Sequence, residues 1–256
     1  MPKGDIDGNL FSIGGQREFR PGWYLGATFG HVDSDVRQGS FNSSGDTDLV
    51  SVGVKRRTGR WEIGFSAAYG SGSFDNERGR VVPWLEGSQR LRSESDIDVY
   101  AVRGRASYEF GQGSWYVRPE LDIDLVQTET DGLSEESDSP LALRVSSDSR
   151  TDVLLSPHVE MGMFRRLGNG LLRAYVDAGV RLSPNEDVSF AARFEETVSD
   201  SGGFEMSMDA PLATGLLTAG GQLSVSERFD LRLEYTLDAN EDYRRQAAMA
   251  RLNWRF

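Results

Sequence analysis

The sequence predicts an all-β protein: a transmembrane, antiparallel, up-and-down β-barrel of about twelve strands, of which eleven are evident. Three observations predict this fold. Apolar and polar residues alternate with a period of two along eleven segments, short and long connections between the segments alternate, and large aromatic residues gather beside the short connections. No segment shows the periodicity of an amphipathic helix, and no apolar run reaches the roughly eighteen residues of a membrane-spanning helix.

Most of the alternating segments have about the ten residues that a tilted strand needs to cross a bilayer. In VYAVRGRASYEF, Tyr100, Val102 and Tyr108 share one face, whereas Arg103 and Arg105 share the other. This follows because successive side chains point to opposite faces of a strand. We expect strands at 10–19, 23–32, 48–57, 61–71, 98–110, 115–126, 151–166, 171–183, 211–225, 229–238 and 246–256.

The connections between these segments alternate strictly in length. Short turns are expected at 20–22, 58–60, 111–114, 167–170 and 226–228. Long polar links are expected at 33–47, 72–97, 127–150, 184–210 and 239–245. Outer-membrane barrels have short periplasmic turns and longer extracellular loops, which produces this alternation. A soluble β-sandwich has no reason to place every long loop at one end, but a lipocalin-like barrel could also alternate in this way.

Composition limits the function classes without deciding between these barrels. The chain has 256 residues and a formal net charge of −12, and its mean hydropathy is −0.46. A strand with only one face in lipid is half polar, so these values do not exclude a membrane barrel. Nothing forms a basic stripe for phosphates, which disfavours nucleic acid as a partner. The absence of cysteine excludes disulfides and thiolate chemistry.

The placement of aromatic residues favours lipid outside the barrel. Rings stand at strand ends beside the short turns, as they do in the girdle at a membrane interface. A soluble core would scatter its rings along the strands. The residues assigned to this interface are Trp23, Trp61, Phe110, Trp115, Phe229 and Trp254.

The polar face then lines a wet lumen, where charges of opposite sign on neighbouring strands can pair. We assign to the lumen Arg103, Arg105, Arg118, Glu120, Asp122, Asp124, His158, Glu160, Arg173, Asp177, Arg181, Arg232 and Glu234.

Three stretches carry a family resemblance. They are FSIGGQREFRPGWYLGATFGHVDSD, with its Gly-rich strand and short turn, WYVRPELDIDLVQTET, and the terminal ARLNWRF. In order and spacing they resemble the C-terminal translocator domain of an autotransporter, the type V secretion system. The resemblance extends over one domain, 1–256, and implies that Leu252, Trp254 and Phe256 form the signal for outer-membrane assembly. Arg251 departs from the family pattern, in which Gly is frequent at this place.

The resemblance implies a bacterial outer-membrane barrel that anchors and helps export an N-terminal passenger domain. The implied partners are outer-membrane lipid and lipopolysaccharide, the barrel assembly machinery and the passenger. We expect a monomer without metal or cofactor, with both ends of the full barrel periplasmic and the long loops extracellular. An odd number of strands leaves the two ends on opposite sides, and MPKGDIDGN shows neither an ascending strand, a lumenal helix nor a signal-peptide core. We therefore expect this chain to be part of a longer precursor, cut within the first hairpin.

Two other functions are weighed against export. The first is a barrel-borne outer-membrane hydrolase, for which Ser156 and His158 on one face could form a nucleophile and base, or Asp122 and Asp124 a carboxylate pair. Both sets are also ordinary positions of a polar lumen wall. The second is a passive porin or adhesin barrel without a passenger.

Two acidic segments could suggest metal sites. His31 with Asp33 and Asp35 is better interpreted as a solvated strand end. The acidic run ETDGLSEESDSP lacks the spacing of an EF-hand and is expected to be a solvated extracellular loop.

Overall fold

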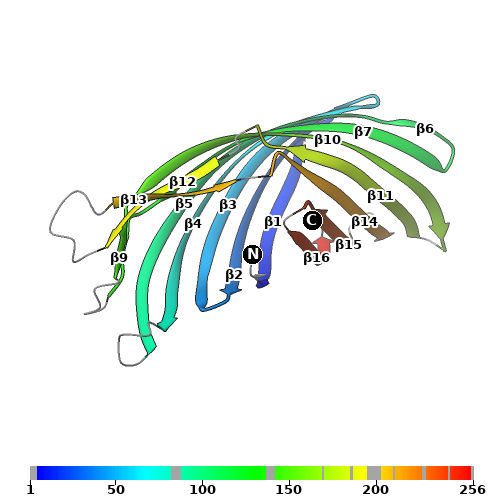
Figure 1. The fold of residues 1–256 in the computed structure, drawn as a ribbon. Coiled ribbons are helices and arrows are strands. Elements are labelled where there is room, and N and C mark those ends of the chain that lie inside the picture. The colour runs from blue at the N-terminus through cyan, green and yellow to red at the C-terminus, as the bar shows by residue number, and fades with distance from the viewer. Residues whose placement is uncertain are drawn as a thin grey trace.

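The computed structural model describes residues 5–81, 88–136, 142–168, 170–184, 187–194, 203–209, 211–226, 229–241 and 243–254. Its main feature is an antiparallel sheet of eleven long strands that is curled into a half-barrel (Figure 1). Each long strand pairs with the long strand that follows it in the sequence. The fold therefore confirms the all-β barrel architecture and the eleven evident strands. The strands are β1 Asp5–Arg20, β2 Trp23–Gln38, β3 Phe41–Thr58, β4 Trp61–Val81, β5 Ser88–Tyr108, β7 Trp115–Thr130, β10 Asp148–Leu167, β11 Gly170–Leu182, β14 Ala213–Ser226, β15 Phe229–Ala239 and β16 Arg244–Trp254. No helix among these residues is long and apolar enough to cross a membrane.

The short connections lie at one end of the sheet, which we call the short-turn end. Gly22, Gly59, Gly113 and Gly168 stand in these turns with φ between 59° and 75°. This left-handed conformation is open to glycine without the steric cost that other residues meet. The third turn also carries the short strand β6, Phe110–Gln112, which pairs with the start of β7. The positions of the short turns match the sequence expectation.

The connections at the opposite end, the long-loop end, differ from the sequence expectation. The link expected at 33–47 is a hairpin, because β2 continues to Gln38 and β3 begins at Phe41. Gly39 makes the turn with φ 63°. The link expected at 72–97 is likewise mostly strand, since β4 and β5 each have 21 residues and pair as far as Val81 and Ser88. The strands thus continue well beyond the ten residues that a bilayer requires.

Two of the expected links contain a second sheet. Its order is β13-β12-β9-β8, with β8 Leu133–Ser134, β9 Leu143–Val145, β12 Asp187–Phe194 and β13 Gly203–Asp209. These strands lie in segments expected to be polar links. β8 and β9 have only two and three residues. β12 and β13 do alternate, as Val188 and Phe190 in β12 and Phe204 and Met206 in β13 show, but the polar residues around them led to their assignment as links. The strands of the second sheet lie at the long-loop end of the main sheet (Figure 1).

An ion pair fastens this second sheet to the main one. The Glu135 carboxylate, which is buried, accepts hydrogen bonds from the Arg78 guanidinium at 2.9 and 2.7 Å. It also accepts one from the backbone N–H of Leu143 at 2.8 Å. Next to it, the N–H of Glu136 donates to the carbonyl oxygen of Arg92 at 2.7 Å. The expectation that this acidic run is simply solvated is therefore wrong at Glu135, because a basic residue on β4 lies within reach of it.

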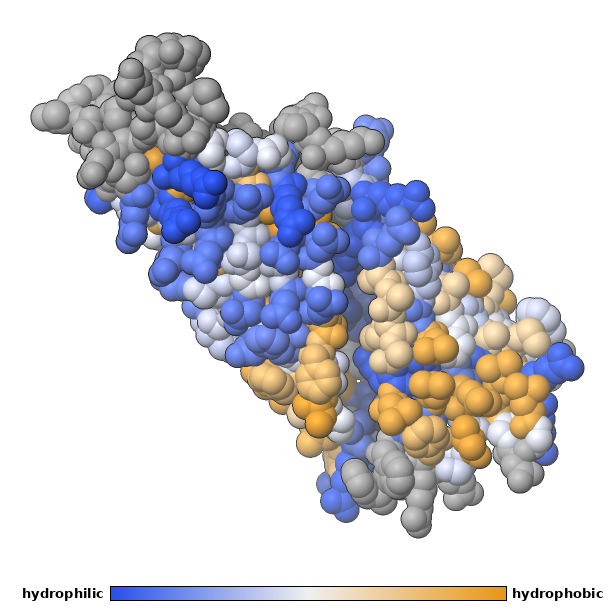
Figure 2. Space-filling view, turned by 90° about the horizontal axis from the view of Figure 1, so that it is seen from below, coloured by the Kyte–Doolittle hydropathy of each residue, from blue (hydrophilic) through white to orange (hydrophobic). Residues whose placement is uncertain are grey.

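The two faces of the main sheet differ in burial and in polarity. Along β7, Leu121, Ile123 and Leu125 are exposed, whereas Asp122 and Asp124 between them are buried. A curled sheet crowds the side chains of its concave face, so the polar residues lie on the inner face and the apolar residues on the outer one. Figure 2 shows that the apolar residues gather toward one end of the molecule, while the other end is hydrophilic.

The edges of the main sheet are β1 and β16. Each pairs with a neighbour on one side only among the described residues: β1 with β2, and β16 with β15. Both strands run toward the short-turn end, because β1 leads into the turn at Gly22 and β16 follows the connection after Ala239. The two edge strands are therefore parallel to each other.

Candidate functional site

Two arginines of β5 pair with two aspartates of β7 on the inner face. Backbone pairing places Arg103 opposite Asp124 and Arg105 opposite Asp122. The Arg105 Nε and Nη2 atoms donate to the Asp122 carboxylate at 2.6 and 2.5 Å. Arg103 donates to Asp124 at 2.5 and 3.2 Å. These are forked arginine–carboxylate pairs, which fix the orientation of both groups. The two aspartates are thus engaged as wall residues rather than poised as a catalytic pair.

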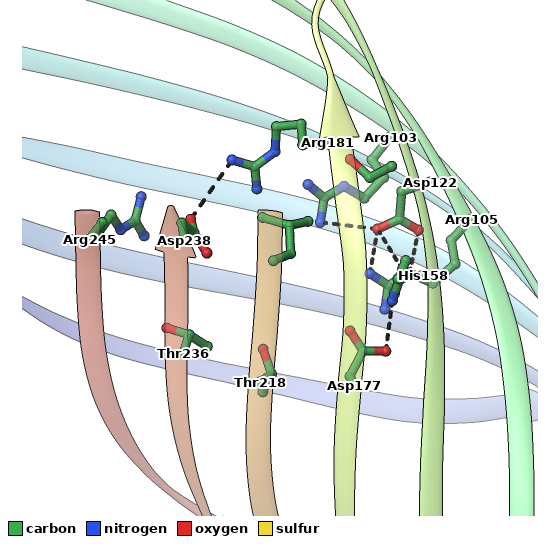
Figure 3. A pocket seen from close by; sticks show the side chains of 12 residues that line it. Arg103, Arg105, Asp122, His158, Asp177, Arg181, Thr218, Thr236, Asp238 and Arg245 are labelled. Atoms are coloured by element: carbon green, nitrogen blue, oxygen red, sulfur yellow. Dashed lines mark hydrogen bonds and ion pairs between the residues drawn. The ribbon is translucent and has the colours of Figure 1, made fainter. Parts of the chain in front are cut away.

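His158 continues this network on the next two strands. Its Nδ1 atom lies 2.8 Å from an Asp177 oxygen, and its Nε2 atom lies 3.8 Å from an Asp122 oxygen (Figure 3). Ser156, on the same face, is buried opposite Asp122. Both ring nitrogens therefore face carboxylates, whereas a general base for a serine must keep one nitrogen directed at the hydroxyl. The geometry favours a charge-paired wall residue over a Ser–His nucleophile.

Nearer the short-turn end, arginines and tyrosines of β7, β11 and β15 stack in alternation. The guanidinium carbons of Arg118 and Arg173 lie 5.2 and 5.3 Å from the centre of the Tyr116 ring. Those of Arg173 and Arg232 lie 4.7 and 5.4 Å from the centre of the Tyr175 ring. These distances fall within the range of cation–π attraction. The five residues form a continuous layer, which we call the Arg–Tyr ladder.

Carboxylates complete the ladder. Glu160 accepts a hydrogen bond from Arg173 and lies 3.5 Å from Arg118. Glu234 accepts one from Arg232 at 2.6 Å and another from the Tyr175 hydroxyl. Glu120 lies 3.7 Å from Arg105 and 3.9 Å from Arg118, and so joins the ladder to the pairs described above. Arg181, farther toward the long-loop end, lies 3.9 Å from Asp238. The structure thus brings all thirteen residues assigned to the lumen onto one face of the sheet.

The two tyrosines of the ladder were not among the residues assigned to the lumen. Both alternate in sequence with apolar residues and so belong to the polar face. Each faces a glycine on the next strand: Tyr116 is opposite Gly162, and Tyr175 is opposite Gly220. A Cβ atom on Gly220 would lie 2.4 Å from the Tyr175 hydroxyl oxygen, so the ring occupies the space above the glycine. A glycine facing an aromatic residue across a strand pair is the signal that could have found them.

The aromatic residues assigned to the membrane interface stand at strand ends beside the short turns. Trp61, Phe110 and Trp115 are exposed on the outer face, while Trp23 and Phe229 are half-buried. These five and Trp254 begin or end strands, and Trp254 pairs with Phe229 through the backbone.

Of the residues assigned to the assembly signal, Leu252 is exposed and in register with the outer face. Phe256 lies outside the described residues.

His31 lies on the outer face, just beyond the apolar residues. Its ring nitrogens lie 2.8 Å from Asp48 and 3.5 Å from Asp33. Asp48 replaces Asp35 as its second partner, because β3 places Asp48 directly opposite the histidine. Among the residues that the structure describes, no group of three or more histidines and carboxylates is arranged to hold a metal ion.

Comparison with known proteins agrees with this architecture. Residues 1–236 match the family model "Autotransporter beta-domain". No curated protein matches the sequence significantly. Among solved structures, the translocator domain of autotransporter NalP from Neisseria meningitidis superposes with a TM-score of 0.82 and 12% identity, over 99% of this chain and 82% of that one.

Two further structures share the fold. The beta domain of the Bordetella autotransporter BrkA superposes with a TM-score of 0.68 and 16% identity, over 99% of this chain and 92% of that one. The transport unit of autotransporter AIDA-I from Escherichia coli superposes with a TM-score of 0.57 and 10% identity, over 99% and 84%. The family model covers most of the sequence, and the fold agrees with it. The chain therefore belongs to the autotransporter β-domain family, as an outer-membrane barrel domain for passenger export.

Proposed function

We propose that the apolar outer face anchors this domain in lipid while the charged inner face gives the exported passenger a wet path. The observation that carries this proposal is the difference between the two faces of the sheet. Along the same strand, exposed apolar side chains point outward and paired charged side chains point inward. In a membrane barrel, lipid-facing and lumen-facing residues alternate in this way. The charged inner face also keeps the wall hydrophilic, so an exported chain that passes along it stays hydrated.

The orientation is inferred from the two connections that contain the second sheet, between β7 and β10 and between β11 and β14, which are the longest and lie at the same end. We place the short-turn end, with the aromatic residues that include Trp61 and Trp115, at the periplasmic interface. The long-loop end, with the second sheet, then faces the cell exterior and contacts lipopolysaccharide. A single chain with one inner face needs no second copy to bury polar residues, which supports a monomer. The C-terminal strand, with Leu252 exposed on the lipid side, is the segment proposed to meet the barrel assembly machinery.

Surface display of the passenger by the full-length protein in a Gram-negative cell tests this function. Protease added to intact cells should remove the passenger while the barrel remains folded in the outer-membrane fraction. A barrel that is inserted and folded while its passenger stays in the periplasm would overturn the export role. Translocator barrels are generally not enzymes, and this test measures export without requiring any catalytic activity of the barrel.

A further inference from the structure

The inner wall presents its cations and hides its anions. Side-chain exposure is 47% for Arg103, 40% for Arg105 and 34% for Arg181. The carboxylates of Asp122 and Asp124, their partners on β7, are exposed by only 6% and 7%. The short aspartates lie close to the sheet, and the longer arginines fold over them. A solute that approaches this wall therefore meets guanidinium groups first, although the charges below nearly balance.

Several of these arginines line a hollow of about 250 Å³ on the inner face. Arg103 and Arg105 enter it from β5, Arg181 from β11 and Arg245 from β16 (Figure 3). The cations therefore come from widely separated strands. The remaining wall includes the hydroxyl groups of Thr218 and Thr236, which add neutral hydrogen-bonding capacity.

The anions of the same hollow are already engaged. Asp122 accepts hydrogen bonds from Arg105 at 2.5 and 2.6 Å, and Asp177 lies 2.8 Å from the ring of His158. Asp238 lies 3.9 Å from Arg181, a separation at which the arginine keeps its hydrogen-bonding capacity for another partner. Arg245 is exposed and faces the same space from the edge strand. Asp124, just outside the hollow, is in turn the close partner of Arg103. Arg103, Arg105 and His158 thus each have a close carboxylate partner, whereas Arg181 has only the more distant Asp238.

We propose that this hollow is a docking site for carboxylate side chains of the polypeptide segment that lies inside the barrel. Guanidinium groups bind carboxylates in a planar, two-point geometry and keep their charge at all relevant pH values. A segment rich in Glu or Asp therefore fits this wall, whereas a Lys-rich segment meets like charge. The inference rests on the proposed export function, because it names the chemistry of the chain that the inner face accommodates.

Peptide binding to the detergent-refolded barrel tests this proposal. The probes are three fluorescein-labelled peptides of equal length, built on an Ala scaffold that carries Glu, Gln or Lys at the same positions. Fluorescence anisotropy in an uncharged detergent is expected to show the Glu peptide binding about tenfold more tightly than the Lys peptide, a difference of about 1.4 kcal/mol. The double variant Arg181→Gln/Arg245→Gln should weaken Glu-peptide binding about fivefold, as expected for two partly exposed ion pairs.

The matched control is Arg90→Gln/Arg244→Gln, which removes the same charge from the outer face. Arg90 is exposed there beside Glu77, and Arg244 directly precedes Arg245 on β16. Equal weakening by both double variants, or a Lys peptide that binds as tightly as the Glu peptide, would overturn the proposal. Passenger display is measured separately in cells. If display fails while the acidic peptide still binds, the export function falls and the docking site stands.

Discussion

Arginine substitution at two consecutive positions of β3 tests which face of the sheet meets lipid. Val52 is 53% exposed on the outer face, between Ala27 of β2 and Ala67 of β4. Ser51, the preceding residue, is on the inner face. We expect Val52→Arg to destabilise the barrel by about 2–4 kcal/mol, the cost of an arginine near the centre of a membrane barrel. Ser51→Arg should cost less than about 1 kcal/mol, because the new charge enters water.

The structure supports the upper part of that range for Val52→Arg. The nearest charged residues on the outer face of β3 are Asp48 and Arg56, each four positions away. Four positions along a strand correspond to about 13 Å. Both direct neighbours are alanines, so the guanidinium would have no partner across the strands either. It could reach water only by bending along the apolar surface.

The assay is equilibrium unfolding by guanidinium chloride of each variant refolded in lipid vesicles, followed by tryptophan fluorescence. The difference in unfolding free energy between variant and wild type gives the cost. Equal costs for the two substitutions, or a larger cost for Ser51→Arg, would refute the assignment of faces. Either outcome would also remove the basis for the proposal that the outer face is anchored in lipid.

Three further outcomes are expected. Gly220→Ala should destabilise the refolded barrel by about 1–3 kcal/mol, because the new methyl group displaces the Tyr175 ring, whereas Gly221→Ala has room and should cost less in the same unfolding assay. Glu135→Gln breaks the ion pair that holds the second sheet, so trypsin should cleave at Arg144 about tenfold faster; an unchanged rate would show that the ion pair does not hold this segment. The folded protein should migrate differently on gels before and after boiling, since the continuous sheet resists detergent, and a single mobility would contradict a stable barrel.

The sequence predicts the barrel best where the two faces meet different solvents. In β7, Leu121 and Asp122 alternate between lipid and the interior, so hydropathy marks the strand clearly. In DSDVRQ and FNSSGDT, which continue β2 and β3, both faces are polar and no such contrast exists. The hairpin there is signalled only by the dipeptide Gly39–Ser40, a combination that suits a two-residue turn.

Side-chain partners were harder to predict than strands. The expectation that charges of opposite sign pair across neighbouring strands is confirmed by the ion pairs of Arg103 with Asp124 and of Arg105 with Asp122. Arg118, which is also close to these aspartates in the sequence, pairs with Glu109 instead.

The register itself runs unchanged from the turn through β6 into β5, since Phe110 faces Val117 and Ser107 faces Glu120. Which guanidinium meets which carboxylate also depends on side-chain conformation, which the sequence pattern does not specify. The Arg–Tyr ladder joins β7, β11 and β15 across the intervening strands β10 and β14, so it depends on the register of five strands at once and local patterns could not reveal it.

The length of the strands has a consequence for how the protein is presented on the cell. On β3, the apolar outer residues end at Val50, and the strand continues for nine residues to Phe41 at the hairpin tip. This corresponds to about 30 Å of strand, or roughly 20 Å of height at the tilt usual in such barrels. In the proposed orientation the sheet forms a rigid collar above the hydrocarbon, level with the sugars of the outer leaflet. The turn at Gly39 then stands at the rim of that collar, where an inserted epitope tag can reach antibodies without disturbing the lipid-embedded part.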